Sequence, residues 1–360
     1  MMKTLLFKYI TLLALSIPLA TTANNDKGKF TKEKTIKKEF TVSASALLKV
    51  DNKYGNLSIT SWNQDRIEIV VHIKTSGNDE EKVQQKLNEI TVDFAASNTL
   101  VSAETIFNKN KIGWGWGNNN NVSMQINYTI KLPVKNSIDL TNDYGTISLD
   151  RIDGHAKINC DYGRLDIGEL RGRNNSLNFD YTSKSEIAYL NSGEINADYS
   201  GFTIEKAGDI ILNADYTSSN ITQMGNLIYS SDYGSLTVGE AQNIEGNGDY
   251  ISIKFGKING NVAVNADYGS LKISELTEKA GNIDINADYT GVKIGYHPSY
   301  TFNFELKSSY GGISGLDGCT ILTKEIKNTK KYYKGNCGSE NSTNFVNIST
   351  EYGSISFNKN

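Results

Sequence analysis

The stretch Asn196-Ala197-Asp198-Tyr199 is the most informative in the chain, because this four-residue word returns at regular intervals. It occurs again at residues 213–216, 265–268 and 286–289, and degenerate copies end at Tyr144, Tyr162, Tyr181, Tyr233, Tyr250 and Tyr310. From Tyr144 to Tyr268 successive tyrosines are 17 to 19 residues apart, and the interval then lengthens twice to 21 residues. A fixed period of this kind is typical of a repeat architecture.

Apolar residues flank each tyrosine in two short alternating runs. Leu271 and Ile273 stand three and five residues after Tyr268, and Ile283 and Ile285 stand six and four residues before Tyr289. Alternation with period two indicates a strand with one buried face. Each repeat is therefore predicted to contain two short strands.

The corner between the two strands is predicted to be tight. The residue two places before the tyrosine is small in most copies, as at Cys160, Ala197 and Ala214. Glycine often follows the tyrosine, as at Gly145 and Gly234, and suits a bend or a bulge.

A repeat of this size cannot bury its apolar face alone. Stacking copies about 4.8 Å apart would build two continuous parallel sheets around one core. The fold class predicted is all-β, a parallel β-solenoid of 17–18-residue coils with two short strands per coil. An antiparallel meander is less favoured, because it needs two-residue Asn-Gly turns, which are scarce here.

In such a stack the corner residues would align into ladders. Like charges about 5 Å apart repel, so each carboxylate is expected to accept backbone N–H bonds in its own turn. A calcium ladder is the alternative, although the calcium-binding solenoid word G-G-x-G-x-D is missing. The tyrosines are interpreted as a structural stack, with an exposed aromatic stripe for glycans as the alternative. The predicted structural ladder comprises Asp161, Tyr162, Asp198, Tyr199, Asp215, Tyr216, Asp232, Tyr233, Asp267, Tyr268, Asp288 and Tyr289.

The composition is that of an ordinary soluble protein. The chain has 360 residues, 38% of them apolar, three prolines and a net charge of −3. Lysine and arginine are dispersed, so no basic stripe predicts a nucleic-acid partner.

The first 23 residues are predicted to be a secretory signal peptide. Lys3 and Lys8 begin it, an apolar run from Ile10 to Leu19 follows, and small residues end it at Ala23. No later stretch is long and apolar enough to predict a transmembrane segment in the mature chain. We expect an exported protein that is periplasmic, associated with the cell surface or secreted, with a charged leader over residues 24–39.

Residues 40–133 lack the period and are interpreted as an N-terminal β segment that caps the repeats. Asn78 followed by Glu81 resembles a capping box, and it predicts a short helix over residues 79–89. The repeats are predicted to occupy residues 134–360.

Trp114 and Trp116 stand between glycines in an asparagine-rich loop of the N-terminal segment. They either cover the end of the core or form an exposed aromatic platform for a sugar or a protein, since tryptophan is favoured where an apolar face meets a wet partner. They are the candidate binding residues.

The three cysteines are assigned different roles. Cys319 and Cys337 bracket a lysine-rich insertion at 319–337, and in an exported protein they are candidates for a disulfide that closes it. Cys160 occupies a small inside position and is expected to be a buried thiol.

No catalytic residues, metal ligands or cofactor are predicted. The acidic residues belong to the repeat, and His72, His155 and His297 lack metal-ligand spacing. Some parallel β-helices cleave polysaccharides with paired carboxylates, but no pair is singled out here.

The signal peptide, the irregular β segment and the Asp-Tyr-Gly coils together resemble the bacterial putative-adhesin family of β-strand-repeat domains of unassigned function. Residues 143–149, 161–167 and 267–273 carry the resemblance, which covers residues 40–360. It implies an exported β-solenoid without catalytic residues.

The leading functional hypothesis is a non-catalytic, adhesin-like protein that binds a surface glycan or protein through its long lateral faces. The alternative is a scaffold protein of the periplasm or cell envelope with a structural or stress-related role. The third possibility is a polysaccharide-cleaving enzyme. No nucleic-acid partner is expected.

Overall fold

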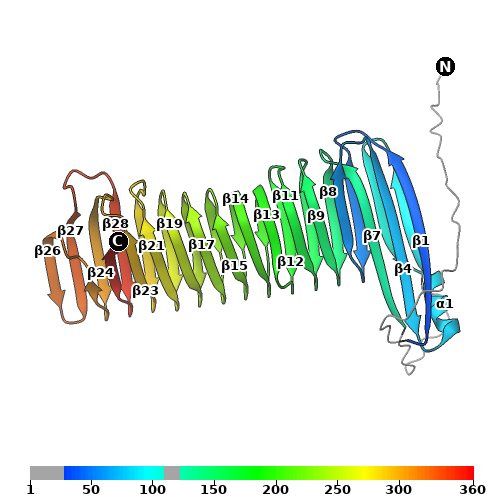
Figure 1. The fold of residues 1–360 in the computed structure, drawn as a ribbon. Helices are drawn as coiled ribbons and strands as arrows, with labels where there is room; N and C mark the ends of the chain where they lie inside the picture. The colour runs from blue at the N-terminus through cyan, green and yellow to red at the C-terminus, as the bar shows by residue number, and fades with distance from the viewer. Residues whose placement is uncertain (1–27, 109–121) are drawn as a thin grey trace, which may run out of the picture. The chain divides into compact units, whose positions relative to one another are not determined.

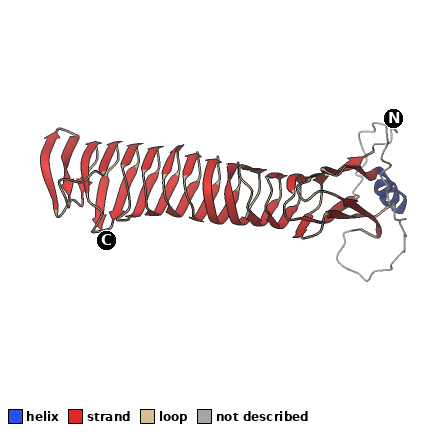
Figure 2. Ribbon diagram, turned by 90° about the horizontal axis from the view of Figure 1, so that it is seen from above, coloured by secondary structure: helices blue, strands red, loops and turns tan. Residues whose placement is uncertain are grey.

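The computed structural model describes residues 28–108 and 122–360. The predicted signal peptide and Trp114 and Trp116 lie outside these residues. The described ranges are all-β, with 29 strands and one helix, which Figure 2 draws in red and blue. The chain divides into two compact units, Met1–Gly154 and His155–Asn360.

The first unit combines long antiparallel strands with short parallel ones. β1 pairs antiparallel with β4, β4 with β7, and β5 with β6, whereas β2 pairs parallel with β6 and β8, and β3 with β7 and β9. Its elements are β1 (Phe30–Thr41), β2 (Leu47–Lys53), β3 (Leu57–Trp62), β4 (Arg66–Gly77), α1 (Glu80–Glu89), β5 (Ile90–Ala96), β6 (Leu100–Phe107), β7 (Ser123–Pro133), β8 (Ser137–Asp143) and β9 (Thr146–Ile152).

Helix α1 forms where the sequence predicts a helix, but its cap is Asp79 rather than Asn78. The Asp79 side chain accepts a 3.2 Å hydrogen bond from the backbone N–H of Lys82, a free donor of the first turn. Val83 and Leu87 are buried, and the helix contacts β1 and β4. At the other end Lys34 Nζ donates to the carbonyls of Leu87 and Ile90, both at 2.6 Å, which satisfies acceptors that the helix leaves unpaired.

The second unit holds the repeats. Its strands are β10 (Ala156–Asp161), β11 (Arg164–Leu170), β12 (Asn175–Asp180), β13 (Ser185–Asn196), β14 (Gly201–Asn213), β15 (Ser218–Gln223), β16 (Leu227–Ser230), β17 (Ser235–Ala241), β18 (Ile244–Asp249), β19 (Ser252–Ile258), β20 (Val262–Asp267), β21 (Ser270–Leu276), β22 (Ile283–Asp288), β23 (Gly291–Tyr296), β24 (Phe302–Ser309), β25 (Ile313–Ser314), β26 (Cys319–Lys327), β27 (Lys330–Cys337), β28 (Phe345–Glu351) and β29 (Ile355–Lys359).

Each repeat strand pairs in parallel with the equivalent strand of the next repeat. One series runs through β15, β17, β19, β21 and β23, which lie side by side in Figure 1, and the other through β16, β18, β20 and β22. The register offset equals the tyrosine spacing, as for Leu236 opposite Ile253. The pairing described for the repeats is therefore parallel, not that of a meander, and the sheet it forms is open.

The chain order breaks at the C-terminal end of the unit. β22 pairs with β28, and β28 pairs with β24, so the last repeat in sequence lies between two earlier ones. β29 lies in the same way between β23 and β25. This insertion is not predictable from the even spacing of Tyr268, Tyr289 and Tyr310.

Alternate side chains of the repeat strands form the core. Leu236, Ile253 and Leu271, which are register partners, are each at most 1% exposed. The small corner residues are buried as well, and among them Cys160 is a thiol outside the disulfide.

Candidate binding surface

The tyrosines of the second unit form one continuous stack along its corner. Ring centroids of neighbours are 4.6 to 5.1 Å apart, and the rings are within 8° of parallel. Each side chain is about half exposed. The order of the stack is Tyr162, Tyr181, Tyr199, Tyr216, Tyr233, Tyr250, Tyr268, Tyr289, Tyr352 and Tyr310.

These tyrosines, and not the glycines after them, carry the unusual backbone of the corner. Their φ angles lie between 51° and 55°, a left-handed conformation that side chains with a Cβ rarely adopt. Gly234 and Gly269 are required for a different reason, because a Cβ on either would lie 2.1 Å from a carbonyl oxygen of the preceding repeat. The glycines therefore permit close approach of successive repeats, and the bend itself is made by the tyrosines.

The aspartates before the tyrosines form a hydrogen-bonded ladder between repeats. Asp232 Oδ1, for example, accepts a 2.8 Å bond from the backbone N–H of Asp249. From the sequence, the N–H donor was predicted to lie in the aspartate's own turn. In the structure the donor is the backbone N–H of the aspartate in the next repeat, because the ends of the two strands lie side by side. The same bond, at 2.8 to 3.4 Å, joins Asp161 to Asp180, Asp180 to Asp198, Asp198 to Asp215, Asp215 to Asp232, Asp267 to Asp288 and Asp288 to Glu351.

A partly exposed amide row runs beside the aspartates. Asn196 Nδ2 donates to Asn178 Oδ1, and Asn213 Nδ2 donates to Asn196 Oδ1, both at 2.8 Å. Amide side chains suit such a row because each has both a donor and an acceptor.

Three tyrosines of the stack have raised pKa values. The pKa values of Tyr199, Tyr233 and Tyr289 are raised by partial desolvation between their neighbours, and further by the charges of adjacent tyrosines and acidic residues. The pKa of Asp249 is also raised, by desolvation and by Asp232 and Asp267 on either side. The hydroxyls of these three tyrosines are therefore neutral at neutral pH.

Stacking determines which part of each ring a partner can reach. Both faces of an inner ring such as Tyr216 are occupied by its neighbours, so a partner meets ring edges and hydroxyl groups. Tyr310, at one end of the series, is the most exposed of these side chains at 61%.

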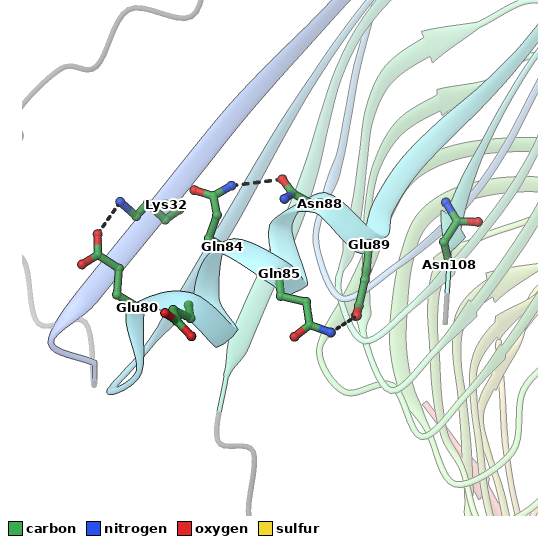
Figure 3. Close-up of a pocket in the computed structure, with 8 residues that line it drawn as sticks. Lys32, Glu80, Gln84, Gln85, Asn88, Glu89 and Asn108 are labelled. Carbon is green, nitrogen blue, oxygen red and sulfur yellow. Dashed lines mark hydrogen bonds and ion pairs between the residues drawn. The ribbon is translucent and has the colours of Figure 1, made fainter. Parts of the chain in front are cut away.

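The first unit has a shorter version of the corner and a polar depression. Tyr54 stacks on Tyr144 with ring centroids 5.2 Å apart, and it also meets Phe107 edge-on. The depression lies along α1, and Figure 3 shows that its side chains pair with one another. The bonds are Lys32 to Glu80 at 2.7 Å, Gln84 to Asn88 at 3.0 Å and Gln85 to Glu89 at 2.9 Å. This depression cannot be recognised from the sequence, because its residues are ordinary polar residues of an exposed helix face.

Residues 28–108 and 122–360 contain no group of three or more histidine, cysteine, aspartate or glutamate side chains placed to hold a metal ion. In the same ranges no helix has the length and apolar character needed to cross a membrane.

The candidate disulfide residues lie opposite each other at one end of a hairpin. Cys319 and Cys337 are register partners in the antiparallel pair β26–β27, and a disulfide joins them.

No protein-family model and no curated protein matches this sequence. Several solved structures that resemble the chain are those of putative adhesins. A putative cell adhesion protein from Clostridium sporogenes is 12% identical, with 91% of this chain and 100% of the other covered and a TM-score of 0.19. A putative adhesin from Parabacteroides distasonis is 10% identical, with 92% and 98% covered and a TM-score of 0.27. A putative lipid binding protein from the same organism is 11% identical, with 90% and 96% covered and a TM-score of 0.29.

Proposed function

We propose that this chain is an exported, non-catalytic β-solenoid that binds an extended glycan or protein at a cell surface or in the cell envelope. The observation that carries the proposal is the row of ten half-exposed tyrosines, stacked at a constant interval beside a carboxylate row and an amide row.

The solenoid part of the proposal rests on strand pairing. Two series of short strands pair in parallel, and in both the offset is one repeat. A chain that advances one coil per repeat and alternates between two sheets produces this pattern.

The binding part rests on the rigidity and regularity of the corner. Each inner tyrosine, such as Tyr216, is held by two neighbouring rings, and its aspartate is held by a backbone N–H of the next repeat. Side chains held in this way lose little conformational entropy when a partner binds, so weak contacts repeated along the row can add up.

The exposed chemistry favours a partner rich in hydrogen-bonding groups. The accessible groups are ring edges, protonated hydroxyls, carboxylates and amides, which suits the hydroxyls of a glycan or a polar protein surface. Because the inner ring faces are occupied, the hydroxyls are expected to contribute more than sugar stacking does.

The test measures binding of the mature chain, from Asn24 onward, to a panel of bacterial and host glycans and matrix proteins. The deciding variant combines Tyr216→Phe, Tyr233→Phe and Tyr250→Phe, which removes three adjacent hydroxyls and keeps the ring stack. Saturable binding that falls at least tenfold in this variant supports the proposal. The comparison variant is Trp114→Ala with Trp116→Ala. If this variant loses binding and the tyrosine variant keeps it, the binding site is the loop that carries the two tryptophans.

A panel without any saturable binding would refute this partner class. The envelope-scaffold alternative would then be favoured, and cell fractionation that recovers the chain only from the periplasm would support it.

A further inference from the structure

The hairpin formed by β26 and β27 extends the sheet beyond the repeats. β27 pairs antiparallel with β24, and β26 pairs antiparallel with β27. Among the described strands β26 has no other pairing, so it is an edge strand. Figure 1 shows the two strands in orange beyond β24.

The hairpin carries a concentrated positive charge. Residues 319–337 contain five lysines and one acidic residue, Glu325, which gives a net charge of +4. The whole chain has a net charge of −3, so the remaining residues sum to −7. The lysines are Lys324, Lys327, Lys330, Lys331 and Lys334.

The same hairpin exposes large apolar side chains. Leu322 is 66% exposed, Ile326 is 54% exposed and Ile321 is 40% exposed, all on β26. Leu322 lies at an irregularity in the register between Ile321 and Thr323, which leaves it without a residue opposite on β27.

The register explains why these apolar residues are uncovered. Ile326 lies opposite Lys331, and Lys324 lies opposite Tyr333, which in turn lies opposite the buried Leu306 of β24. Directly opposed residues share a face of the sheet. One face of the hairpin therefore continues the buried face of β24 out to β26, where it meets solvent.

Two lysines lie on this apolar face, since Lys324 is opposite Tyr333 and Lys331 is opposite Ile326, and the other lysines of the hairpin lie on its opposite face. The ammonium group of Lys324 lies 5.1 Å from the centre of the Tyr333 ring, and Lys331 Nζ donates to the carbonyl of Gly311. Lys327, with 81% of its side chain exposed, pairs with Glu325 at 3.2 Å. Long basic side chains beside exposed leucine and isoleucine can reach phosphate groups while the apolar residues enter a hydrocarbon layer.

We propose that the β26–β27 hairpin binds the surface of an anionic lipid bilayer. A second copy of the hairpin is disfavoured as the occupant, because two surfaces of charge +4 repel. A soluble anionic polymer would neutralise the lysines and leave Leu322 and Ile326 in water. A lipid surface with phosphate headgroups satisfies both the charge and the apolar residues. This inference does not depend on the tyrosine row, which lies along the corner of the repeats.

The test is flotation of the mature chain with vesicles of phosphatidylglycerol and phosphatidylcholine, compared with phosphatidylcholine vesicles. We expect binding to the anionic vesicles that weakens as salt is added. Replacing Lys324, Lys327 and Lys330 by glutamine should lower the partition coefficient about 100-fold, since each lysine near such a surface contributes about 1 kcal/mol. Leu322→Ser with Ile326→Thr should lower it at least about tenfold.

Matched controls come from the same unit. Lys254, Lys272 and Lys293 are exposed register partners on β19, β21 and β23, and their replacement by glutamine removes the same charge elsewhere. Ile211→Thr with Ile228→Thr removes an exposed apolar pair, 46% and 52% exposed, on β14 and β16. Both controls should keep their vesicle binding, and circular dichroism should show that every variant is folded.

Three outcomes would overturn the proposal. The first is a lack of binding to anionic vesicles at low salt, and the second is an equal loss in the hairpin variants and their controls. The third is full binding by the Leu322 and Ile326 variant together with equal affinity for dextran sulfate, which would assign the hairpin to a soluble polyanion.

Discussion

The ring of Tyr216 lies parallel to that of Tyr233, with a centroid distance of 4.8 Å and an interplanar angle of 3°, although 17 residues separate them in sequence. Tyr216 has the same relationship to Tyr199 on its other side. Each aromatic pair contributes about 0.5–1.5 kcal/mol beyond its buried area. The stack is therefore one of the forces that hold successive repeats together.

Replacing Tyr216 should separate the effect of stacking from that of backbone conformation. Tyr216→Asn removes both ring contacts and keeps a residue that tolerates positive φ, so it should lower the free energy of unfolding by about 1–3 kcal/mol. Tyr216→Val should lower it by about 1–2 kcal/mol more, because a β-branched residue is disfavoured at this φ. Tyr216→Phe, the control, should change it by less than about 0.5 kcal/mol. Urea unfolding measures all three, and equal stability of the valine and asparagine variants would contradict the backbone argument.

Asp249→Asn should stabilise the protein at neutral pH. The pKa of Asp249 is raised in the folded state, so protonated Asp249 stabilises the fold relative to the ionised form. This stabilisation is fully present below the ordinary pKa of aspartate and is lost as the pH rises through the folded-state pKa. Asparagine keeps an oxygen acceptor and removes the repulsion from Asp232 and Asp267. The melting temperature should therefore rise at pH 7 in low salt, and this gain should shrink near pH 3 and in high salt. A gain that is the same at both pH values would argue against charge repulsion as the cause.

Tyr229→Phe should also stabilise the protein. The Tyr229 side chain is 2% exposed, its hydroxyl has no hydrogen-bond partner in the described residues, and its register partner is Gly246. A Cβ at Gly246 would lie 2.3 Å from the Tyr229 ring, so the glycine makes room for the aromatic side chain. Removing an unsatisfied buried hydroxyl should raise the free energy of unfolding by about 1 kcal/mol.

Tyr128→Phe is the matched control and should have the opposite sign. The Tyr128 hydroxyl lies 2.8 Å from Thr105 Oγ1 in the first unit, and burial raises the pKa of Tyr128 to about 12. Loss of this buried hydrogen bond should lower the free energy of unfolding by about 0.5–1.5 kcal/mol. Chemical denaturation of both variants measures the two changes, and destabilisation by Tyr229→Phe would reveal a partner for that hydroxyl.

Removing the disulfide should loosen the β26–β27 hairpin. Cys319 and Cys337 close a segment with a sequence separation of 18, and cross-linking a loop of this size contributes about 3 kcal/mol. In the variant Cys319→Ala with Cys337→Ala, trypsin should cleave faster after Lys327 and Lys330. Mass spectrometry of the fragments identifies the sites. Unchanged cleavage rates would show that pairing of β27 with β24 is sufficient to hold the hairpin.

Local periodicity made part of the corner predictable. The Asp198-Tyr199 word and the alternation at Leu271 and Ile273 predicted the strands on either side of the corner, and the all-β class is confirmed. The left-handed backbone of the tyrosines was not foreseen, because glycine is the residue that ordinarily signals positive φ. The aspartate bonds to the next repeat were also missed, since they depend on register between strands.

The sequence by itself determined the period, the alternation that buries one face of each strand, and the tyrosine at each corner, because these depend on neighbours a few residues apart. Only the tertiary structure decided the order of the last repeats. Tyr352 stacks between Tyr289 and Tyr310, with both centroid distances 4.6 Å, although Tyr310 precedes it in sequence. All three repeats carry the same corner, so local pattern does not distinguish the two orders. The order follows from the pairing of β28 with both β22 and β24. Register partners are 63 residues apart in the chain in the β22–β28 pair and about 40 residues apart in the β24–β28 pair.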